Sequence, residues 1–145
     1  MSAIHFSHIG LCVVDAARSL RFYTGALGFE VGDKFEVDDT FAGVMEVARP
    51  LKLISQFVKK DGVQLEFLQY VSPDHCGEPV RRPMNQLGLT HLSLRVEAIE
   101  PVVEKILAHG GQVHRETYLN NGPAGEFIYC TDPDGIRIEL MRLPG

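Results

Sequence analysis

The sequence has no run of lysine and arginine and no long apolar stretch, and both absences narrow the range of partners. Lys and Arg number 14 against 19 Asp and Glu, which gives a formal net charge of −5. Nucleic acids and anionic membranes are bound through basic patches, so the sequence indicates neither as a partner. No apolar run approaches the roughly 20 residues that a membrane-spanning helix needs. The expected partner is a small molecule.

The N-terminal segment also lacks the features of a secretory signal. Residues 1–8 read Met-Ser-Ala-Ile-His-Phe-Ser-His, with neither a basic n-region nor an apolar h-region. The three cysteines, Cys12, Cys76 and Cys130, are odd in number and share no Cys-x-x-Cys spacing. This pattern argues against a disulfide framework or a zinc knuckle. We therefore expect free thiols and a cytoplasmic location.

The most informative feature that is present is an internal repeat. His91 follows His8 by 83 positions (91 − 8 = 83). The same shift, without a gap, aligns Leu11 with Leu94, Val13 with Val96, Leu20 with Val103, Tyr23 with Ile106 and Gly28 with Gly111. A match at one fixed shift predicts two copies of one module. Modules of about 70 residues are marginal alone, so we expect one domain, residues 1–145, with a shared core.

The composition places the module boundaries. Residues 73–87 are rich in Ser, Pro, Asp, Gly, Glu and Arg, and their prolines interrupt both helices and strand ladders. We therefore predict module one at residues 4–72, a linker at residues 73–87 and module two at residues 88–143.

Each module is predicted to begin with a strand and a helix and to end with a hairpin. Asp15 is a natural helix N-cap, and Asp61-Gly62 and Asp132-Pro133-Asp134-Gly135 are strong turn sequences. In module one we predict strands at 6–13, 29–35, 43–48, 51–58 and 63–70, and a helix from 15 to about 27. In module two we predict strands at 89–96, 112–117, 127–131 and 136–142, and a helix at 99–109.

Four polar residues share one position in the strand pattern. His8, Glu66, His91 and Glu139 each lie between aliphatic neighbours that face the opposite way. If the apolar faces pack on the helices, the opposite faces carry two imidazoles and two carboxylates. One such residue alone is more often merely exposed or hydrogen bonded. A His in the first strand and a Glu in the last, found twice, instead favours a divalent metal: Zn, Ni, Co, Mn or Fe(II).

The chain resembles the vicinal oxygen chelate superfamily, which includes glyoxalases, bleomycin resistance proteins and dioxygenases. The resemblance covers nearly the whole chain and rests on residues 8–15, 22–23, 27–29, 88–94 and 132–140. It implies an α+β fold of two paired βαβββ modules, whose curled mixed sheet surrounds a metal-binding cleft with the helices outside. It also implies a homodimer, with the cleft formed within one chain or across two.

Carried over position by position, the resemblance makes His8, Glu66, His91 and Glu139 the metal ligands. Four such ligands resemble the isomerase branch, glyoxalase I and methylmalonyl-CoA epimerase. In that branch the metal acts as a Lewis acid while a carboxylate moves the proton next to a carbonyl. Glu139 is the first candidate for this base and Glu66 the second.

The choice within the superfamily stays open. Cys12 stands where glyoxalase I often has an arginine for a glutathione carboxylate, and Glu46 is a loose match to an extra glutamate of the epimerase. Arg81 and Arg82 are more typical of surface charges than of a site for a CoA phosphate, and the role of Arg95 is open. The alternatives are a non-haem Fe(II) dioxygenase and a resistance-type protein that sequesters a ligand.

Overall fold

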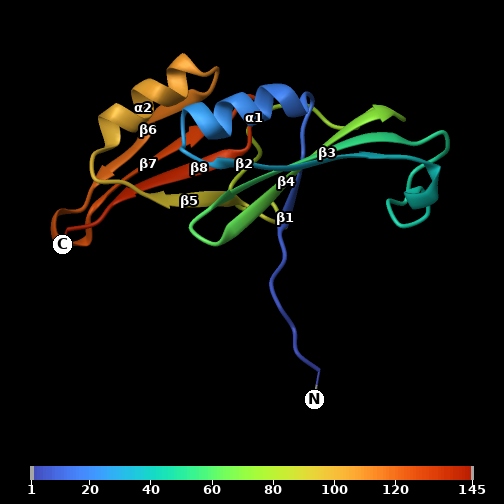
Figure 1. The fold of residues 1–145 in the computed structure, drawn as a ribbon. Coiled ribbons are helices and arrows are strands. Elements are labelled where there is room, and N and C mark those ends of the chain that lie inside the picture. Colours follow the sequence, from blue (N-terminus) through green and yellow to red (C-terminus); the bar gives the residue numbers. More distant parts are fainter. Residues whose placement is uncertain (1, 145) are drawn as a thin grey trace. The chain divides into compact units, whose positions relative to one another are not determined.

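The structure is a computed structural model, which describes residues 2–144, and it divides into two compact units (Figure 1). The first unit contains the chain up to Thr24 together with Gly28–Gly77. The second contains Gly25–Leu27 and the chain from Glu78 onward. Neither helix within residues 2–144 has the length and apolar character to cross a membrane.

The first unit is a four-stranded mixed sheet with one α-helix. Strand β1 runs parallel to β4, while β3 pairs antiparallel with both β4 and β2, which gives the order β1-β4-β3-β2. Its elements are β1 (Ile9–Cys12), α1 (Ala16–Gly25), β2 (Glu30–Val37), the 3-10 helix η1 (Asp39–Phe41), β3 (Lys52–Lys60) and β4 (Val63–Ser72).

The second unit repeats this connectivity. Its order is β5-β8-β7-β6, with β5 parallel to β8 and the other two pairings antiparallel. Its elements are β5 (His91–Arg95), α2 (Ile99–Ala108), β6 (Gln112–Asn120), the 3-10 helix η2 (Gly122–Ala124), β7 (Glu126–Thr131) and β8 (Arg137–Arg142). The predicted α+β fold of two βαβββ modules is thereby confirmed.

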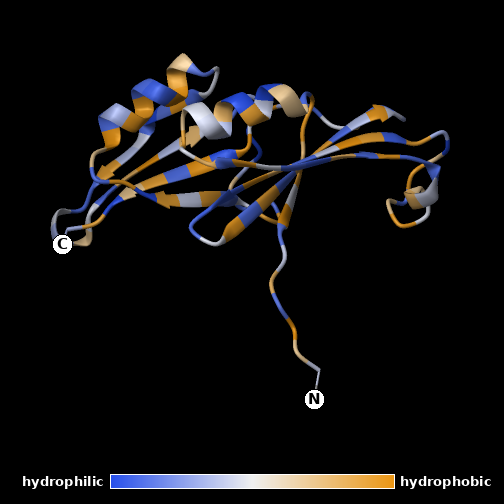
Figure 2. Cartoon of the chain, viewed as in Figure 1, coloured by the Kyte–Doolittle hydropathy of each residue, from blue (hydrophilic) through white to orange (hydrophobic). Residues whose placement is uncertain are grey.

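Each unit buries one face of its sheet. In the first, the Tyr23 ring of α1 lies 4.9 Å from the Phe67 ring of β4, and both side chains are fully buried. In the second, α2 contacts β6, β7 and β8, and Val103 of the helix and Ile138 and Leu140 of β8 are fully buried. Apolar and polar residues alternate along the strands (Figure 2), so the opposite faces present polar side chains.

The ends of α1 follow from local chemistry. Asp15 Oδ1 accepts a hydrogen bond from the backbone N–H of Arg18 at 3.1 Å, which confirms it as a cap. The helix ends at Gly25 rather than near residue 27. Gly28 has a φ of 73°, and the N–H of Phe29 donates to the carbonyl of Tyr23 at 3.0 Å. This left-handed turn satisfies a terminal carbonyl and redirects the chain into β2.

The strand predicted at residues 43–48 is wrong. The segment forms turns after η1, and Glu46 has a φ of 57°, a left-handed conformation that no strand residue adopts. The carboxylate of Asp39 accepts from the N–H of Leu51 at 2.5 Å and ties the two ends together. Apolar residues of the segment pack on a small cluster that contains Ala42 and Leu51. The apolar pattern of residues 43–48 therefore reflects packing against this cluster rather than pairing with another strand.

Candidate metal-binding and catalytic site

The first unit brings His8 and Glu66 together. His8 stands directly before β1, and because Gly10 pairs with Glu66 in the parallel register, the imidazole reaches the carboxylate. Nε2 of His8 lies 3.2 Å from Oε1 of Glu66. The hydroxyl of Ser7 is 2.7 Å from Nδ1 of His8, and the hydroxyl of Ser55 donates to Glu66 Oε2 at 2.6 Å.

The second unit brings His91 and Glu139 together in a similar way. Nε2 of His91 lies 3.9 Å from Oε1 of Glu139, and Ser93 on β5 pairs with Glu139 on β8 in the parallel register. The hydroxyl of Thr90 is 2.8 Å from Nδ1 of His91, and the hydroxyl of Ser93 donates to Glu139 Oε1 at 2.7 Å. Each unit therefore holds one imidazole nitrogen beside one carboxylate.

The residues that support these pairs were missed from the sequence. Ser7 and Thr90 both place a hydroxyl on Nδ1 of the following histidine, and they obey the repeat shift (90 − 7 = 83). An aromatic ring also flanks each histidine edge-on: Phe57 lies 5.1 Å from the His8 ring and Tyr129 lies 5.5 Å from the His91 ring. The sequence did carry a signal for these contacts, because a hydroxyl residue precedes each histidine at equivalent positions of the repeat.

This donor chemistry fits a divalent metal. A hydroxyl on Nδ1 fixes the ring orientation and leaves Nε2 for a metal, as partners of metal-bound histidines commonly do. Imidazole and carboxylate without thiolate suit several divalent ions. Within residues 2–144, no three or more His, Cys, Asp or Glu side chains are gathered to hold an ion. Each unit contributes two of the four predicted ligands, and the four-residue set stays a prediction.

Tyr129 connects the second pair to its surroundings. Its hydroxyl lies 3.4 Å from Glu139 Oε2 and donates to it. Burial raises the pKa of Tyr129, and the negative charge of Glu139 raises it further. The phenol therefore stays protonated at neutral pH and can donate a hydrogen bond. In the first unit Phe57 faces Glu66 in the strand register, so the two carboxylates have different neighbours.

Three further residues that the sequence singled out are Cys12, Arg95 and Glu46. Cys12 is exposed, and burial, followed by charge on Cys12 and Glu66, raises the pKa of Tyr70. Arg95 is an exposed residue of β5, and Glu46 lies in the turns after η1.

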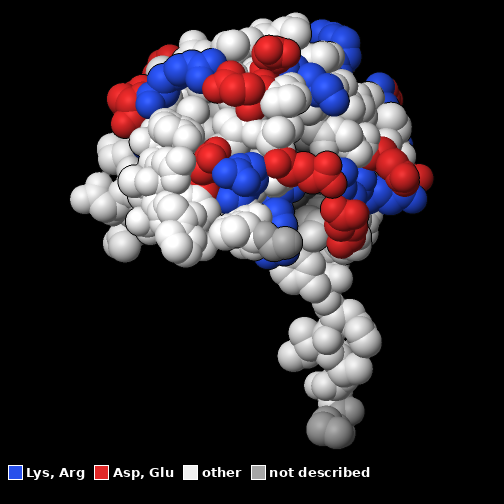
Figure 3. Space-filling view, turned by 90° about the vertical axis from the view of Figure 1, so that its left-hand side faces the viewer, with Lys and Arg blue, Asp and Glu red and all other residues white. Residues whose placement is uncertain are grey.

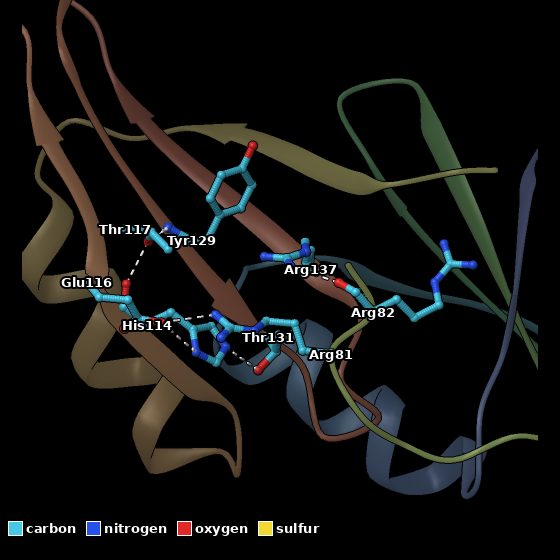
Figure 4. Close-up of polar contacts among 8 residues, drawn as sticks. All are labelled: Arg81, Arg82, His114, Glu116, Thr117, Tyr129, Thr131 and Arg137. Atoms are coloured by element: carbon cyan, nitrogen blue, oxygen red, sulfur yellow. Dashed lines mark hydrogen bonds and ion pairs between the residues drawn. The ribbon is translucent and has the colours of Figure 1, made fainter. Parts of the chain in front are cut away.

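Arg81 lies against the polar face of the second unit (Figure 4). Its Nη1 is 3.2 Å from Oε1 of Glu116 on β6. The imidazole of His114 lies nearby, with Nε2 3.1 Å from the Thr131 hydroxyl. Burial, followed by the positive charge of Arg81, lowers the pKa of His114. His114 is therefore neutral in the folded protein near pH 7.

The depressed pKa of His114 predicts a pH-dependent stability. The unfolded chain binds a proton at His114 near pH 6.5, before the folded chain does, so the free energy of unfolding should fall as pH drops below about 6.5. His114→Gln should make this slope shallower between about pH 5 and pH 7 in urea unfolding. His5→Gln, at an exposed N-terminal histidine, controls for the loss of one histidine. Equal slopes for His114→Gln and the wild type would contradict the assignment.

Charged side chains of both signs are interspersed on the face seen in Figure 3, without a broad basic patch there. In the second unit a salt bridge joins β6 to α2, with Arg115 Nη1 2.7 Å from Glu100 Oε1. This surface is unlike the basic footprint that nucleic acids require.

The chain is similar in sequence and in fold to known proteins. It is 28% identical over 138 residues to a putative lactoylglutathione lyase of Brassica oleracea var. gemmifera, covering 94% of this chain and 44% of that protein. The chain thus spans less than half the length of this curated relative. A glyoxalase family protein from Bacillus cereus superimposes with a TM-score of 0.86 at 17% identity, covering 100% of this chain and 97% of that one.

A further structural relative is a fosfomycin resistance protein from Listeria monocytogenes. It superimposes with a TM-score of 0.64 at 16% identity, covering 99% of this chain and 96% of that one. Likeness at this level of identity shows the fold. The family model for the Glyoxalase/Bleomycin resistance protein/Dioxygenase superfamily matches residues 5–140. With this match over almost the whole length, the chain belongs to that superfamily.

Proposed function

We propose that this protein is a divalent-metal-dependent isomerase or lyase that moves a proton next to a carbonyl. The observation that carries the proposal is the duplicated arrangement of a histidine Nε2 beside a carboxylate, with a hydroxyl on Nδ1. His8 and Glu66 form it at 3.2 Å and His91 and Glu139 at 3.9 Å. A single such pair has many structural explanations, whereas the same pair in both modules supports a metal-ligating role for each pair.

The proposed chemistry divides between the metal and the protein. A bound divalent ion would supply Lewis-acid stabilisation of a substrate oxygen. Glu139 would take the proton from the carbon beside the carbonyl and return it, and Glu66 is the second candidate for this role. The hydroxyls of Ser93 and Tyr129 hold Glu139 by hydrogen bonds of 2.7 and 3.4 Å. These two hydrogen bonds would orient the Glu139 carboxylate and decrease its basicity until the carboxylate moves away from the two hydroxyls.

The substrate class we propose is a small thiol conjugate or thioester. The name of the Brassica relative, lactoylglutathione lyase, supports the first. Cys12, at the position where glyoxalase I often has an arginine, leaves room for the second, a reaction like that of methylmalonyl-CoA epimerase. We further propose a cytoplasmic homodimer.

Metal analysis of the full chain tests the proposal first. Protein purified without chelator, or reconstituted separately with Zn, Ni, Co, Mn and Fe(II), is expected to hold stoichiometric metal with at least one of them. Solvent deuterium incorporation into methylmalonyl-CoA, run beside the methylglyoxal and glutathione assay, then separates the two substrate classes.

Two outcomes would favour the alternatives. Stoichiometric iron with oxygen consumption in the presence of a catechol would indicate a dioxygenase. Failure to hold any of the five metals would contradict the metal site and favour a resistance-type binding protein, in keeping with the fold shared with the Listeria protein.

A further inference from the structure

A second group of functional side chains lies on the polar face of the second unit, beside His91 and Glu139. Arg137 precedes Glu139 by two residues on β8, so both point to the same side of the sheet. In the parallel register Arg137 pairs with His91. The guanidinium carbon of Arg137 lies 5.6 Å from the ring centroid of Tyr129, whose hydroxyl contacts Glu139. Tyr129 therefore lies between the arginine and the catalytic candidate.

The linker brings a second guanidinium to the same place. Arg137 Nη2 donates to the backbone carbonyl of Arg82 at 2.8 Å, which holds the linker against the start of β8 (Figure 4). Arg81 directly precedes Arg82 in the linker, so the contact with Arg137 also keeps Arg81 near the start of β8. Glu116 neutralises Arg81 in part. Arg137 is held by a carbonyl and an aromatic ring, two partners that leave its positive charge in place.

The surroundings of Arg137 suit an anion. An oxyanion beside a guanidinium accepts a charge-assisted hydrogen bond, and a second guanidinium nearby adds Coulomb attraction. The planar fork of arginine carries five N–H donors, and the bond to Arg82 uses one of them. Partial burial strengthens such an interaction, because the local dielectric is lower than that of water.

We propose that Arg137, assisted by Arg81, binds a carboxylate or phosphate group of the substrate. Residues two apart on a strand are about 7 Å apart, so this group would lie one short molecular arm from Glu139. The role as a substrate subsite rests on the proposed function. It adds that the substrate is acidic, with its anionic group a few bonds from the reacting carbonyl.

Binding of simple anions to the full chain tests this subsite without relying on metal or turnover. Inorganic phosphate and acetate are titrated separately into chelator-treated protein, and the backbone amide resonances of β7 and β8 are followed by NMR. We expect saturable shifts around Tyr129 and Arg137. Arg137→Gln should weaken binding about tenfold or more, since a charge-assisted hydrogen bond is lost. Arg81→Gln, on the exposed linker, should weaken it less.

The matched control is Arg115→Gln, an exposed arginine of β6 that pairs with Glu100, and it should bind both anions as the wild type does. Tighter binding of phosphate than of acetate would identify the anionic group of the substrate as a phosphate, and the opposite order would identify it as a carboxylate. Equal binding by wild type, Arg137→Gln and Arg81→Gln, or equal weakening by Arg115→Gln, would overturn the subsite. If phosphate binding depends on Arg137 but no metal binds, the anion site stands and the proposed function fails. If metal binds but Arg137→Gln leaves anion binding unchanged, the anion site fails and the proposed function stands.

Discussion

Metal content is expected to fall from stoichiometric to near background when His91 or Glu139 is replaced by alanine. Each substitution removes one of the two donors that we propose the second unit supplies, which lie 3.9 Å apart. Losing a direct ligand should cost more than losing its outer partner, which typically weakens metal affinity about 10–100-fold. The measurement is metal per chain after dialysis against a weak chelator. His5→Ala and Glu104→Ala, at exposed positions, are the matched controls.

Turnover measurements should distinguish the carboxylate that acts as the catalytic base from the one that serves only as a metal ligand. Glu139→Gln keeps the shape and an oxygen donor but removes the basic carboxylate, so turnover should drop about 10²–10⁴-fold. Glu66→Gln should reduce it less if Glu139 is the base. The reverse order would assign the proton transfer to Glu66. Retention of both metal and activity in Glu139→Ala would contradict the site altogether.

Gly135→Ala is expected to lower the free energy of unfolding by about 2–4 kcal/mol, from backbone strain and overpacking together. Gly135 has a φ of 84°, and an added Cβ would lie 2.5 Å from the carbonyl carbon of Val80 and 2.9 Å from the backbone nitrogen of Arg81. These are backbone atoms, which cannot rotate aside. Urea unfolding measures the change.

The control for Gly135 is Gly62→Ala in the β3–β4 turn. Gly62 has a φ of 80° and no atom within 4 Å of an added Cβ, so only the conformational cost of a left-handed residue, about 1–2 kcal/mol, applies. Since the clash would also displace Arg81, Gly135→Ala should weaken phosphate binding as well, whereas Gly62→Ala should leave it unchanged. Equal destabilisation by both substitutions would show that the contact with the linker carries no energy.

Much of the fold was predictable because its signals are local. The Asp15 cap, the Asp61-Gly62 turn and the alternation around Glu66 and Glu139 depend on neighbouring residues only. The strand predicted at residues 43–48 failed for the same reason. Its apolar residues satisfy a strand pattern locally, but the bond between Asp39 and Leu51 and the packing near Ala42 decide its conformation.

The sequence by itself determined the duplication, the polar face of each module and the four candidate ligands, because a repeat and a two-residue period can be read without knowing which strands pair. Only the tertiary structure decided the surroundings of those ligands. Ser93 is 46 residues from Glu139 in the chain, and Arg82 is 55 residues from Arg137. Such contacts arise from strand register and from the linker crossing β8, which no local pattern encodes.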